Sequence, residues 1–328
     1  MPAFFLAAAL TGCNDWQSAL HPAAPQADEI YKLFLIFLGV AAFVWTAVML
    51  ALLIGLLRRK PERDDPLQTN PSSERAVGQT IFGLSIATTA IVLALSVLSY
   101  LAQRTVFAKD GNNPVIRVIG HQWWWEVQYE GPPDQRFTTA NEIRIPVGQP
   151  IAIKLETRDV IHSFWVPSLS GKMDQINNQE NDLQLTAEKP GVYRGQCAEF
   201  CGMQHAHMGF DVVAMPREQY EDWRTNQLKS AQPPQEPETQ QGELIFRGRG
   251  CAVCHTITGT PAGGKLGPDL THLASRRTIA ASTLPLTPGN LAGWISDPQH
   301  IKPGNRMPPV WLDGQELSAL VRYLGSLQ

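Results

Sequence analysis

The sequence predicts a multi-domain membrane protein that consists of a two-helix transmembrane hairpin, an all-β domain and an all-α domain. Three observations lead to this prediction. Two long apolar runs without charged residues lie in the first third of the chain, short alternating segments follow them, and a helical pattern closes the C-terminal part. The 328 residues are enough for two or three domains. A net charge of −3 gives no indication of nucleic acid as a partner.

The chain begins with a short apolar run, residues 1–10, which Thr11, Gly12 and Cys13 follow. The run is too short to span a bilayer. Small residues between an apolar core and a cysteine resemble a bacterial lipoprotein signal, in which Cys13 would carry the lipid. No basic residue precedes the run, and the alternative is an apolar terminus with an incidental cysteine. We therefore interpret residues 1–30 as a lipoprotein-like signal and an external N-terminal tail.

Residues 31–104 are expected to form the transmembrane hairpin. Residues 33–57 and 76–101 carry no charge, and each run is long enough to cross a membrane with some tilt. Basic residues crowd the short connection between them, and the positive-inside bias places such a loop in the cytoplasm. These residues are Arg58, Arg59, Lys60, Arg63 and Arg75. We therefore expect a two-pass protein of the bacterial cell (inner) membrane, with both termini and both C-terminal domains on the external or periplasmic side.

Residues 105–225 have the pattern of an all-β domain. Apolar and polar residues alternate at 115–119, 143–147 and 151–155, and Gly, Pro, Asn and Asp punctuate the gaps. This pattern predicts short antiparallel strands in a sandwich or barrel. Two later strands, expected near residues 191 and 210, flank a loop that is rich in metal-binding side chains.

This loop, Cys197-Ala-Glu-Phe-Cys-Gly-Met-Gln-His-Ala-His-Met208, offers two thiols, two imidazoles and two thioethers. The pattern C-x-x-x-H-x-x-M from Cys201 to Met208 is typical of copper electron-transfer sites, where a thiolate, an imidazole and a weak thioether suit both oxidation states. A second thiolate at Cys197 could bridge to a second copper ion. Zinc and a plain disulfide are the alternatives, although zinc does not favour thioether sulfur and prefers C-x2-C spacing.

A cupredoxin-like copper site needs one more imidazole from an earlier strand. His162 is the best candidate, although a lone histidine at a strand end is more often structural. The neighbouring ligand loop favours the metal-binding interpretation. His207 is a weaker candidate than His205, because the two side chains would approach a metal from opposite sides of the chain.

Residues 226–240 are rich in Gln, Pro and Glu, which predicts a semi-extended tether. The remaining residues, 241–328, have the pattern of an all-α domain. Residues 242–246 read as part of a first helix, and apolar residues share one face of a last helix expected at 313–327.

Cys251-Ala-Val-Cys-His255 is the attachment signature of c-type haem. Cys251 and Cys254 would form the thioether bonds, and His255 would become the proximal iron ligand. The carbonyl of Pro268 would orient His255. Met307, the only methionine after residue 215, is expected as the sixth ligand rather than as a core residue. A zinc site and a redox dithiol are the alternatives for the cysteine pair.

Residues 28–225 resemble subunit II of haem–copper cytochrome c oxidases. The similarity rests on the paired spans, on His121-Gln-Trp-Trp-Trp-Glu126, on the His162 segment and on the motif C-x-E-x-C-x-x-x-H-x-x-M. It implies a binuclear copper centre, CuA, and a magnesium ion shared with subunit I that the carboxylate of Glu199 reaches. It also implies that electrons from cytochrome c enter at Trp123. The implied CuA ligands are His162, Cys197, Cys201, His205, Met208 and the main-chain carbonyl of Glu199.

Two positions depart from this family. Gln175-Ile-Asn-Asn178 stands where the family usually has an Ile-Pro-Gly turn. Gln79, with Glu74 nearby, stands where the family often has a glutamate that is proposed as a proton entrance.

The C-terminal segment resembles class I cytochrome c, and its fusion to an oxidase subunit II is the arrangement of caa-type oxidases. This resemblance implies the subunit through which electrons enter a proton-translocating terminal cytochrome c oxidase. The implied path leads from a cytochrome c donor through haem c, or through Trp123, to CuA. From there it leads to haem a of subunit I, and subunit I reduces oxygen to water. Subunits I and III are the implied partners.

Two other functional classes remain open at this point. A membrane-anchored electron-transfer protein could serve another reductase, for instance one that acts on nitrogen oxides, but a soluble partner would require only one anchor. A copper or haem sensor, or a metal-delivery protein, would require no covalent haem. A quinol-oxidising relative is disfavoured because such subunits lack the thiolate ligands.

Overall fold

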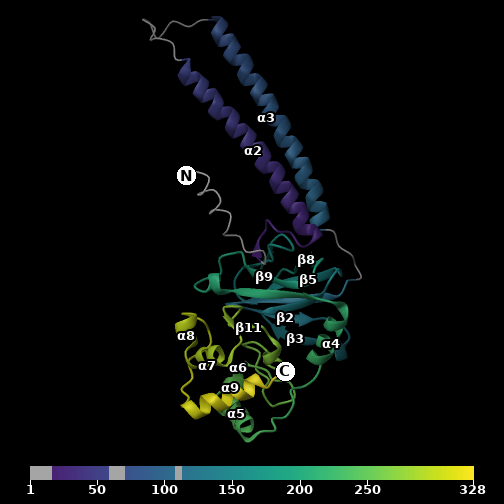
Figure 1. Cartoon of the computed structure of the whole chain (residues 1–328), viewed down its shortest axis with the longest axis vertical. Coiled ribbons are helices and arrows are strands. Elements are labelled where there is room, and N and C mark those ends of the chain that lie inside the picture. Colours follow the sequence, from purple (N-terminus) through teal and green to yellow (C-terminus); the bar gives the residue numbers. More distant parts are fainter. Residues whose placement is uncertain (1–16, 59–70, 108–112) are drawn as a thin grey trace, which may run out of the picture. The chain divides into compact units, whose positions relative to one another are not determined.

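The structure is a computed structural model that describes residues 17–58, 71–107 and 113–328. The chain divides into a helical unit, residues 28–107, and a globular unit that contains the other described residues (Figure 1). Cys13 and most of the basic connection between the two apolar runs lie outside the described residues. The lipid attachment and the cytoplasmic loop therefore stay predictions.

The helical unit contains α2 (Pro25–Leu57) and α3 (Pro71–Val106), which are long and apolar enough to cross a membrane. The apolar stretches of these two helices are not buried against other described residues, as expected of helices that face lipid or another subunit. The hydroxyls of Thr80, Thr89 and Ser96 each donate a hydrogen bond of 2.8–2.9 Å to the carbonyl four residues earlier. These groups are satisfied within α3, so they need no polar partner in a membrane.

Two five-stranded sheets form the all-β domain within the described residues. The first sheet has the order β3 (Phe137–Ala140), β2 (Trp124–Tyr129), β1 (Val115–His121), β5 (Ile151–Thr157) and β8 (Asn181–Leu185). The second has the order β4 (Glu142–Pro146), β10 (Gly209–Met215), β9 (Gly191–Cys197), β6 (His162–Trp165) and β7 (Met173–Gln175). A short 3₁₀ turn, η2 (Pro133–Gln135), joins β2 to β3.

The expectation of antiparallel strands is wrong for two pairs. β1 and β5 run parallel, and so do β4 and β10, whereas the other pairs in these two sheets are antiparallel. Parallel neighbours require a crossover connection. The chain supplies it by passing to the opposite sheet between the two members of each parallel pair.

The alternation of side chains along the strands builds the core of a cupredoxin-like β-sandwich. In β2, Trp125, Val127 and Tyr129 are buried, whereas the residues between them are partly exposed. Trp125 meets Phe164 and Phe210 from the second sheet, with ring centroids 6.1 and 5.2 Å away. Two facing sheets with this alternation bury one common apolar layer.

The segment expected as a semi-extended tether, residues 226–240, is bound to the C-terminal domain. Helix α4 (Arg217–Gln227) extends into it, and α5 (Pro237–Gly248) begins before its predicted end. Between these helices, the Ala231 N–H donates to the Thr258 carbonyl over 2.9 Å, and the Lys229 carbonyl accepts from Nε2 of His272 over 3.0 Å. Its composition contains few apolar residues, but main-chain hydrogen bonds attach it without them.

The C-terminal domain is helical and has its own core, which includes Phe246, Leu320 and Tyr323. Its main contact is the crossing of α5 and α9, at which Gly242 lies against the backbone of α9. The Asp313 side chain caps α9, and Glu316 completes the capping box. The other elements are α6 (Cys251–Cys254), η4 (Leu273–Ser275), β11 (Thr278–Ile279), β12 (Leu284–Pro285), α7 (Pro288–Ser296), α8 (Pro298–Ile301) and α9 (Gly314–Gly325).

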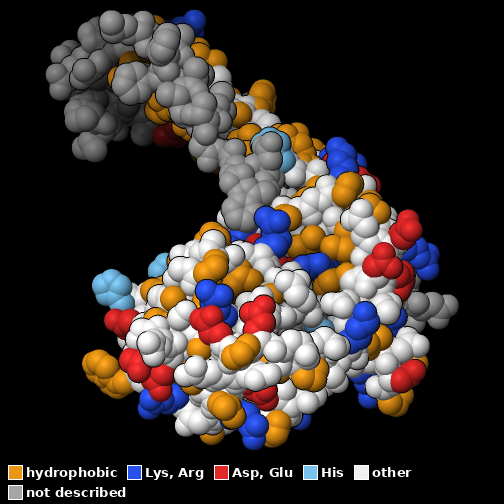
Figure 2. All heavy atoms as spheres, turned by 60° about the horizontal axis from the view of Figure 1, so that its bottom comes forward, with side chains coloured by type: hydrophobic (Ala, Val, Ile, Leu, Met, Phe, Trp, Pro, Cys, Tyr) orange, Lys and Arg blue, Asp and Glu red, His pale blue; other side chains and the backbone are white. Residues whose placement is uncertain are grey.

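On the face shown in Figure 2, Lys and Arg side chains are interspersed with Asp and Glu over the globular unit. This face carries no broad area of positive charge of the kind that nucleic-acid binding requires.

Candidate copper and haem sites

The end of the second sheet carries the predicted copper ligands. His162 begins β6 and Cys197 ends β9, and these strands are hydrogen-bonded neighbours. The Cys197 N–H donates to the Met208 carbonyl over 3.0 Å, and the Ala198 N–H donates to the Ser163 carbonyl over 2.9 Å. The ligand loop is therefore fixed to its strands at both of its ends.

Cys197 lies at the centre of the first group of donor atoms. Its Sγ is 3.8 Å from Nδ1 of His162, 3.8 Å from Sγ of Cys201 and 3.2 Å from the carbonyl oxygen of Glu199. Among the described residues, His162, Cys197 and Cys201 form the only group of at least three His, Cys, Asp or Glu whose ligand atoms all lie within 4.8 Å.

Cys201 forms a second, adjoining group. Its Sγ is 3.6 Å from Nδ1 of His205 and 3.7 Å from Sδ of Met208. A short 3₁₀ turn, η3 (His205–His207), brings the imidazole and the thioether to the same sulfur. Each thiol thus has its own imidazole, and the two thiols face each other.

The sulfur and imidazole atoms of this cluster are largely shielded from solvent. His162, Cys197, Cys201 and Met208 are buried, and His205 is partly buried. The indole N–H of Trp125, in the sandwich core beneath the loop, donates to the Met208 carbonyl over 3.3 Å. An apolar surrounding of this kind limits water access and influences the potential of a metal centre.

The two thiols titrate as a pair. The hydrogen bond between their sulfurs lowers the pKa of Cys197 and raises that of Cys201, so the pair holds one negative charge more readily than two. Burial acts against a charge on His162, but hydrogen bonds with Asp159 and Cys197 outweigh burial and raise its pKa. Metal ions bind thiolate and neutral imidazole, so metal binding releases the protons that these groups hold.

The donor set fits copper better than the alternatives. The two sulfurs are 3.8 Å apart and both thiols are free, whereas a disulfide has an S–S distance of about 2.05 Å. Two thiolates, two imidazoles and a thioether are soft ligands that suit copper, and a thioether is not among the usual zinc ligands. His207 is exposed, and its Nδ1 is 2.8 Å from Oε1 of Gln204.

Glu199 presents its two polar groups in different directions. Its carbonyl oxygen contacts Cys197, whereas its carboxylate is 46% exposed and 3.9 Å from Nζ of Lys172. The neighbouring Phe200 side chain is 78% exposed. The carboxylate is therefore accessible to a partner.

The three consecutive tryptophans have different surroundings. Trp123 is buried, and its indole N–H donates to the Cys201 carbonyl over 3.0 Å. Trp124 stacks on His121 with centroids 4.4 Å apart, and Trp125 belongs to the sandwich core. Of the three, only Trp123 donates directly to a cysteine of the predicted metal loop.

Asp159 is a site residue that the sequence interpretation did not single out. Its Oδ1 is 2.9 Å from Nε2 of His162, and its Oδ2 accepts from the Gln122 N–H over 2.7 Å. Burial acts to raise the pKa of Asp159, but these hydrogen bonds outweigh burial and lower it. The sequence does place a carboxylate three residues before the candidate ligand His162. The direction of the Asp159 side chain, however, depends on the fold.

In the helical domain, α6 carries Cys251 and Cys254, and His255 follows as its C-terminal cap residue. Nδ1 of His255 is 2.7 Å from the Pro268 carbonyl, which leaves Nε2 for a metal. A Cβ on Gly267 would lie 2.7 Å from Cε1 of this ring, so the loop approaches the imidazole as closely as glycine permits. Burial lowers the pKa of His255 and favours the neutral form that binds iron.

Both cysteines of this motif are free thiols, as thioether formation requires. Met307 lies in the segment between α8 and α9, where the Asn305 side chain accepts from its N–H over 2.8 Å and Gln299 donates to its carbonyl over 2.9 Å. These bonds hold the main chain of Met307 and leave its thioether free of hydrogen bonds. The Cys-x-x-Cys-His motif therefore fits a covalently attached haem with His255 as an iron ligand, and Met307 as the second iron ligand stays a prediction.

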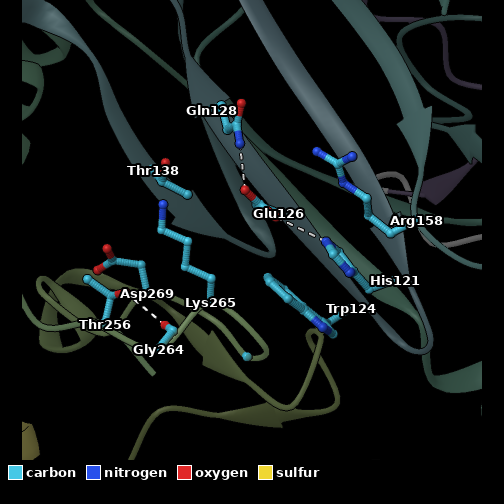
Figure 3. A pocket seen from close by; sticks show the side chains of 11 residues that line it. His121, Trp124, Glu126, Gln128, Thr138, Arg158, Thr256, Gly264, Lys265 and Asp269 are labelled. Carbon is cyan, nitrogen blue, oxygen red and sulfur yellow. Dashed lines mark hydrogen bonds and ion pairs between the residues drawn. The ribbon is translucent and has the colours of Figure 1, made fainter. Parts of the chain in front are cut away.

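The two domains of the globular unit also share a partly open cavity of about 450 Å³, lined mostly by polar and charged residues (Figure 3). His121, Trp124 and Glu126 line it from the β-sandwich, and Lys265 points into it from the helical domain. Glu126 is 3.0 Å from Nε2 of His121. None of the predicted copper or haem ligands lines this cavity, but Thr256 and Gly267, which lie beside His255, do, so the cavity adjoins the candidate haem site.

Fold and ligand residues together define a membrane-anchored protein that joins a cupredoxin-like domain to a c-type cytochrome domain. The family model described as "Cytochrome C oxidase subunit II, periplasmic domain" matches residues 134–215, and the cytochrome c model matches residues 239–328. Cytochrome c oxidase subunit 2 of Alkalihalophilus pseudofirmus is 35% identical over all of this chain and 96% of its own length. The chain therefore belongs to the cytochrome c oxidase subunit II family, in a form with a C-terminal cytochrome c domain.

Two further similarities were found. Quinol oxidase subunit 2 of Bacillus cereus is 30% identical over 73% of this chain and 82% of its own length. The crystal structure of the periplasmic domain of subunit II of the Bradyrhizobium japonicum cytochrome oxidase matches 37% of this chain and 96% of its own length, with 26% identity and a TM-score of 0.35.

Proposed function

We propose that this chain is the subunit through which electrons enter a proton-translocating terminal cytochrome c oxidase. A cytochrome c donor delivers electrons to the C-terminal haem c, and the CuA centre passes them to haem a of subunit I, where oxygen is reduced to water. When bound, the copper ions and haem c supply one-electron redox centres. The observation that supports the proposal is the cluster of sulfur and imidazole atoms around Cys197 and Cys201, in a domain that contacts the domain with the c-type haem motif.

The residues of the chain hold these centres in defined surroundings. We assign the two copper ions to His162, Cys197, Cys201, His205, Met208 and the carbonyl of Glu199. The thioether bonds belong to Cys251 and Cys254, and the iron ligands are His255 and Met307, with the Pro268 carbonyl orienting the imidazole. The burial of the copper ligands excludes water, and the fixed loop ends limit rearrangement when an electron arrives.

Trp123 offers a second path that we consider secondary. Its indole N–H contacts the Cys201 carbonyl, so the ring is directly attached to the copper loop. However, Trp123 is buried, and its carbonyl accepts a hydrogen bond from Lys302 of the cytochrome domain. A separate cytochrome c would therefore meet the fused domain before it reached this ring.

Docking onto subunit I, with subunit III alongside, is the role proposed for the helical unit. The two apolar helices expose large hydrophobic side chains that a membrane subunit and lipid can cover. The exposed carboxylate of Glu199 could bind a magnesium ion together with ligands from subunit I. We retain the predicted orientation, in which both redox domains lie outside the cytoplasm, since haem attachment and copper insertion both suit that side. Neither Gln79 nor Glu74 receives a role in proton uptake.

The test is optical and uses the full chain. It would be produced in a host with haem-attachment machinery, purified in detergent and loaded with copper. Reduced cytochrome c would then be added without oxygen, while the haem band and the near-infrared copper band are followed together. We expect haem c to be reduced first and the copper band to bleach afterwards. The absence of a near-infrared band in copper-loaded protein would exclude the paired-thiolate centre and with it the oxidase function.

Co-purification separates this function from electron delivery to another reductase. A tagged chain should purify with a large multi-span subunit that contains haem a. Purification with a reductase of nitrogen oxides instead would contradict the proposal.

A further inference from the structure

Lys302 is a buried lysine at the boundary between the two redox domains. It caps the C-terminus of α8 and is 2% exposed, although lysine is among the residues that are least often buried. Its Nζ donates to the carbonyls of His207 over 2.8 Å, Trp123 over 3.2 Å and Ala280 over 3.2 Å. An ammonium group has three N–H donors, and these three acceptors satisfy all of them.

Two of these three acceptors belong to the copper-binding domain. His207 lies between His205 and Met208 in the ligand loop, and the side chain of Trp123 is bound to the Cys201 carbonyl. The third acceptor, Ala280, belongs to the cytochrome domain that also contains Lys302. The ammonium group therefore joins the main chains of both domains at one point.

The residues that follow Lys302 continue this contact towards Met307. The side chain of Gln204 donates to the Pro303 carbonyl over 2.7 Å. Gly304 has a φ of +80°, and a Cβ at this position would lie 2.0 Å from Cε of Met203, so the backbone touches the copper loop directly. Residues 302–306, which we call the latch loop, thus lie on the copper loop and lead into the candidate haem ligand.

Arg306 completes the contact at the far end of the latch loop. Its Nη2 donates to Oε1 of Gln122 over 2.6 Å and lies 3.6 Å from Oδ2 of Asp159. The other side-chain group of Gln122, Nε2, donates to the Cys201 carbonyl over 2.9 Å. The residue before Met307 is therefore one hydrogen-bonded side chain away from a cysteine of the copper loop.

We propose that Lys302 is a positioning residue for electron transfer between the two domains, which ties the latch loop to the copper loop and fixes the separation of the two redox sites. The inference rests on the proposed function, because it requires that electrons pass from the cytochrome domain to the copper domain. Electron tunnelling slows steeply with distance, so a small loss of docking has a large effect on rate. A lysine is suited to this task because its three donors can bridge carbonyls from separate segments, which an apolar side chain cannot do.

The test is Lys302→Met in the full chain with both cofactors loaded, since methionine keeps an unbranched stem and removes the donors. Haem c would be reduced by a rapid photochemical pulse, and the transfer to copper would be followed at the near-infrared band. We expect the rate of transfer to fall severalfold, because tunnelling slows with each ångström that separates the two centres. The two absorption spectra and midpoint potentials should remain those of the wild type. Lys229→Met is the matched control. It alters an exposed lysine in the segment between α4 and α5 and should transfer electrons at the wild-type rate.

Arg306→Gln provides a second measurement that does not depend on a buried residue, since this side chain is 64% exposed. It should slow transfer less than Lys302→Met, and it decides the question if Lys302→Met does not accept its cofactors. Unchanged transfer in loaded Lys302→Met, or in Arg306→Gln where the first variant fails, overturns the positioning role. Failure of the wild type to transfer electrons between its loaded centres would instead overturn the proposed function itself.

Discussion

The carboxylate of Asp159 lies 2.9 Å from Nε2 of His162, the ring nitrogen opposite to the one that faces Cys197. A carboxylate on the far nitrogen of a metal-binding histidine fixes its tautomer and orientation and increases its basicity. Oδ2 of the same group accepts the N–H of Gln122, next to Trp123. Asp159 therefore connects a candidate copper ligand with the segment that the cytochrome domain covers.

We predict that Asp159→Asn weakens copper binding by about tenfold, the lower end of the range for such supporting carboxylates. The amide preserves the shape but has one oxygen where the two carboxylate oxygens accept separate hydrogen bonds, so the substitution removes the charge and one acceptor. Competition with a copper chelator measures the effect. Glu188→Gln removes an exposed carboxylate of the same domain and should bind copper like the wild type. Equal retention of copper by both variants would show that the charge of Asp159 has no such role.

Cys201 is the sulfur that both candidate groups share. It lies within 3.8 Å of Cys197, His205 and Met208, so its loss removes the bridge between the two halves of the site. We predict that Cys201→Ser abolishes the near-infrared copper band and oxidase turnover and leaves the haem c spectrum intact. Absorption spectra of the purified variant and oxygen consumption by its oxidase complex test this. Retained turnover would contradict the copper assignment.

Substitution of Met307 should alter the haem site and spare the copper site. The helical domain has a core separate from that of the β-sandwich, so a change in the iron ligand need not disturb the copper loop. We predict that Met307→Ala changes the haem c spectrum and lowers its midpoint potential, because a thioether ligand raises the potential of haem, while the copper band is unchanged. An unaltered haem spectrum would exclude Met307 as a ligand.

The candidate ligands could be predicted from the sequence because most of them lie within short motifs. Cys197 to Met208 and Cys251 to His255 each fit in one loop or turn, where spacing alone limits the geometry. Helix α9 was predictable for the same reason, since Asp313 and Glu316 form a local capping box. His162 required one non-local assumption, and the structure does bring it to Cys197.

Features that depend on distant contacts were not predictable. Lys302 is 179 residues from Trp123, and a lysine at a helix end normally indicates solvent exposure. The parallel pairing of β1 with β5 depends on the order of crossovers, which alternation within single strands does not report. The segment around Lys229 was predicted as a tether from its composition, but its main chain is bound to Thr258 and His272, and composition carries no information on main-chain partners.

Gly242 supports a prediction about the stability of the cytochrome domain. It lies in α5 where this helix crosses α9, and a Cβ there would be 2.2 Å from the Ala319 carbonyl oxygen and 2.6 Å from Cβ of Tyr323. Gly242→Ala should therefore force the two helices apart and destabilise the domain by about 2 kcal/mol. The midpoint of thermal unfolding, followed by haem absorbance in the full chain, should fall by roughly 10 °C. Gly248→Ala is the matched control, because this glycine lies in the last turn of the same helix with no atom within 4 Å of an added Cβ. That variant should be neutral or slightly more stable, since alanine favours the helix. If both variants unfold at the wild-type temperature, the close crossing at Gly242 does not limit the stability of the domain.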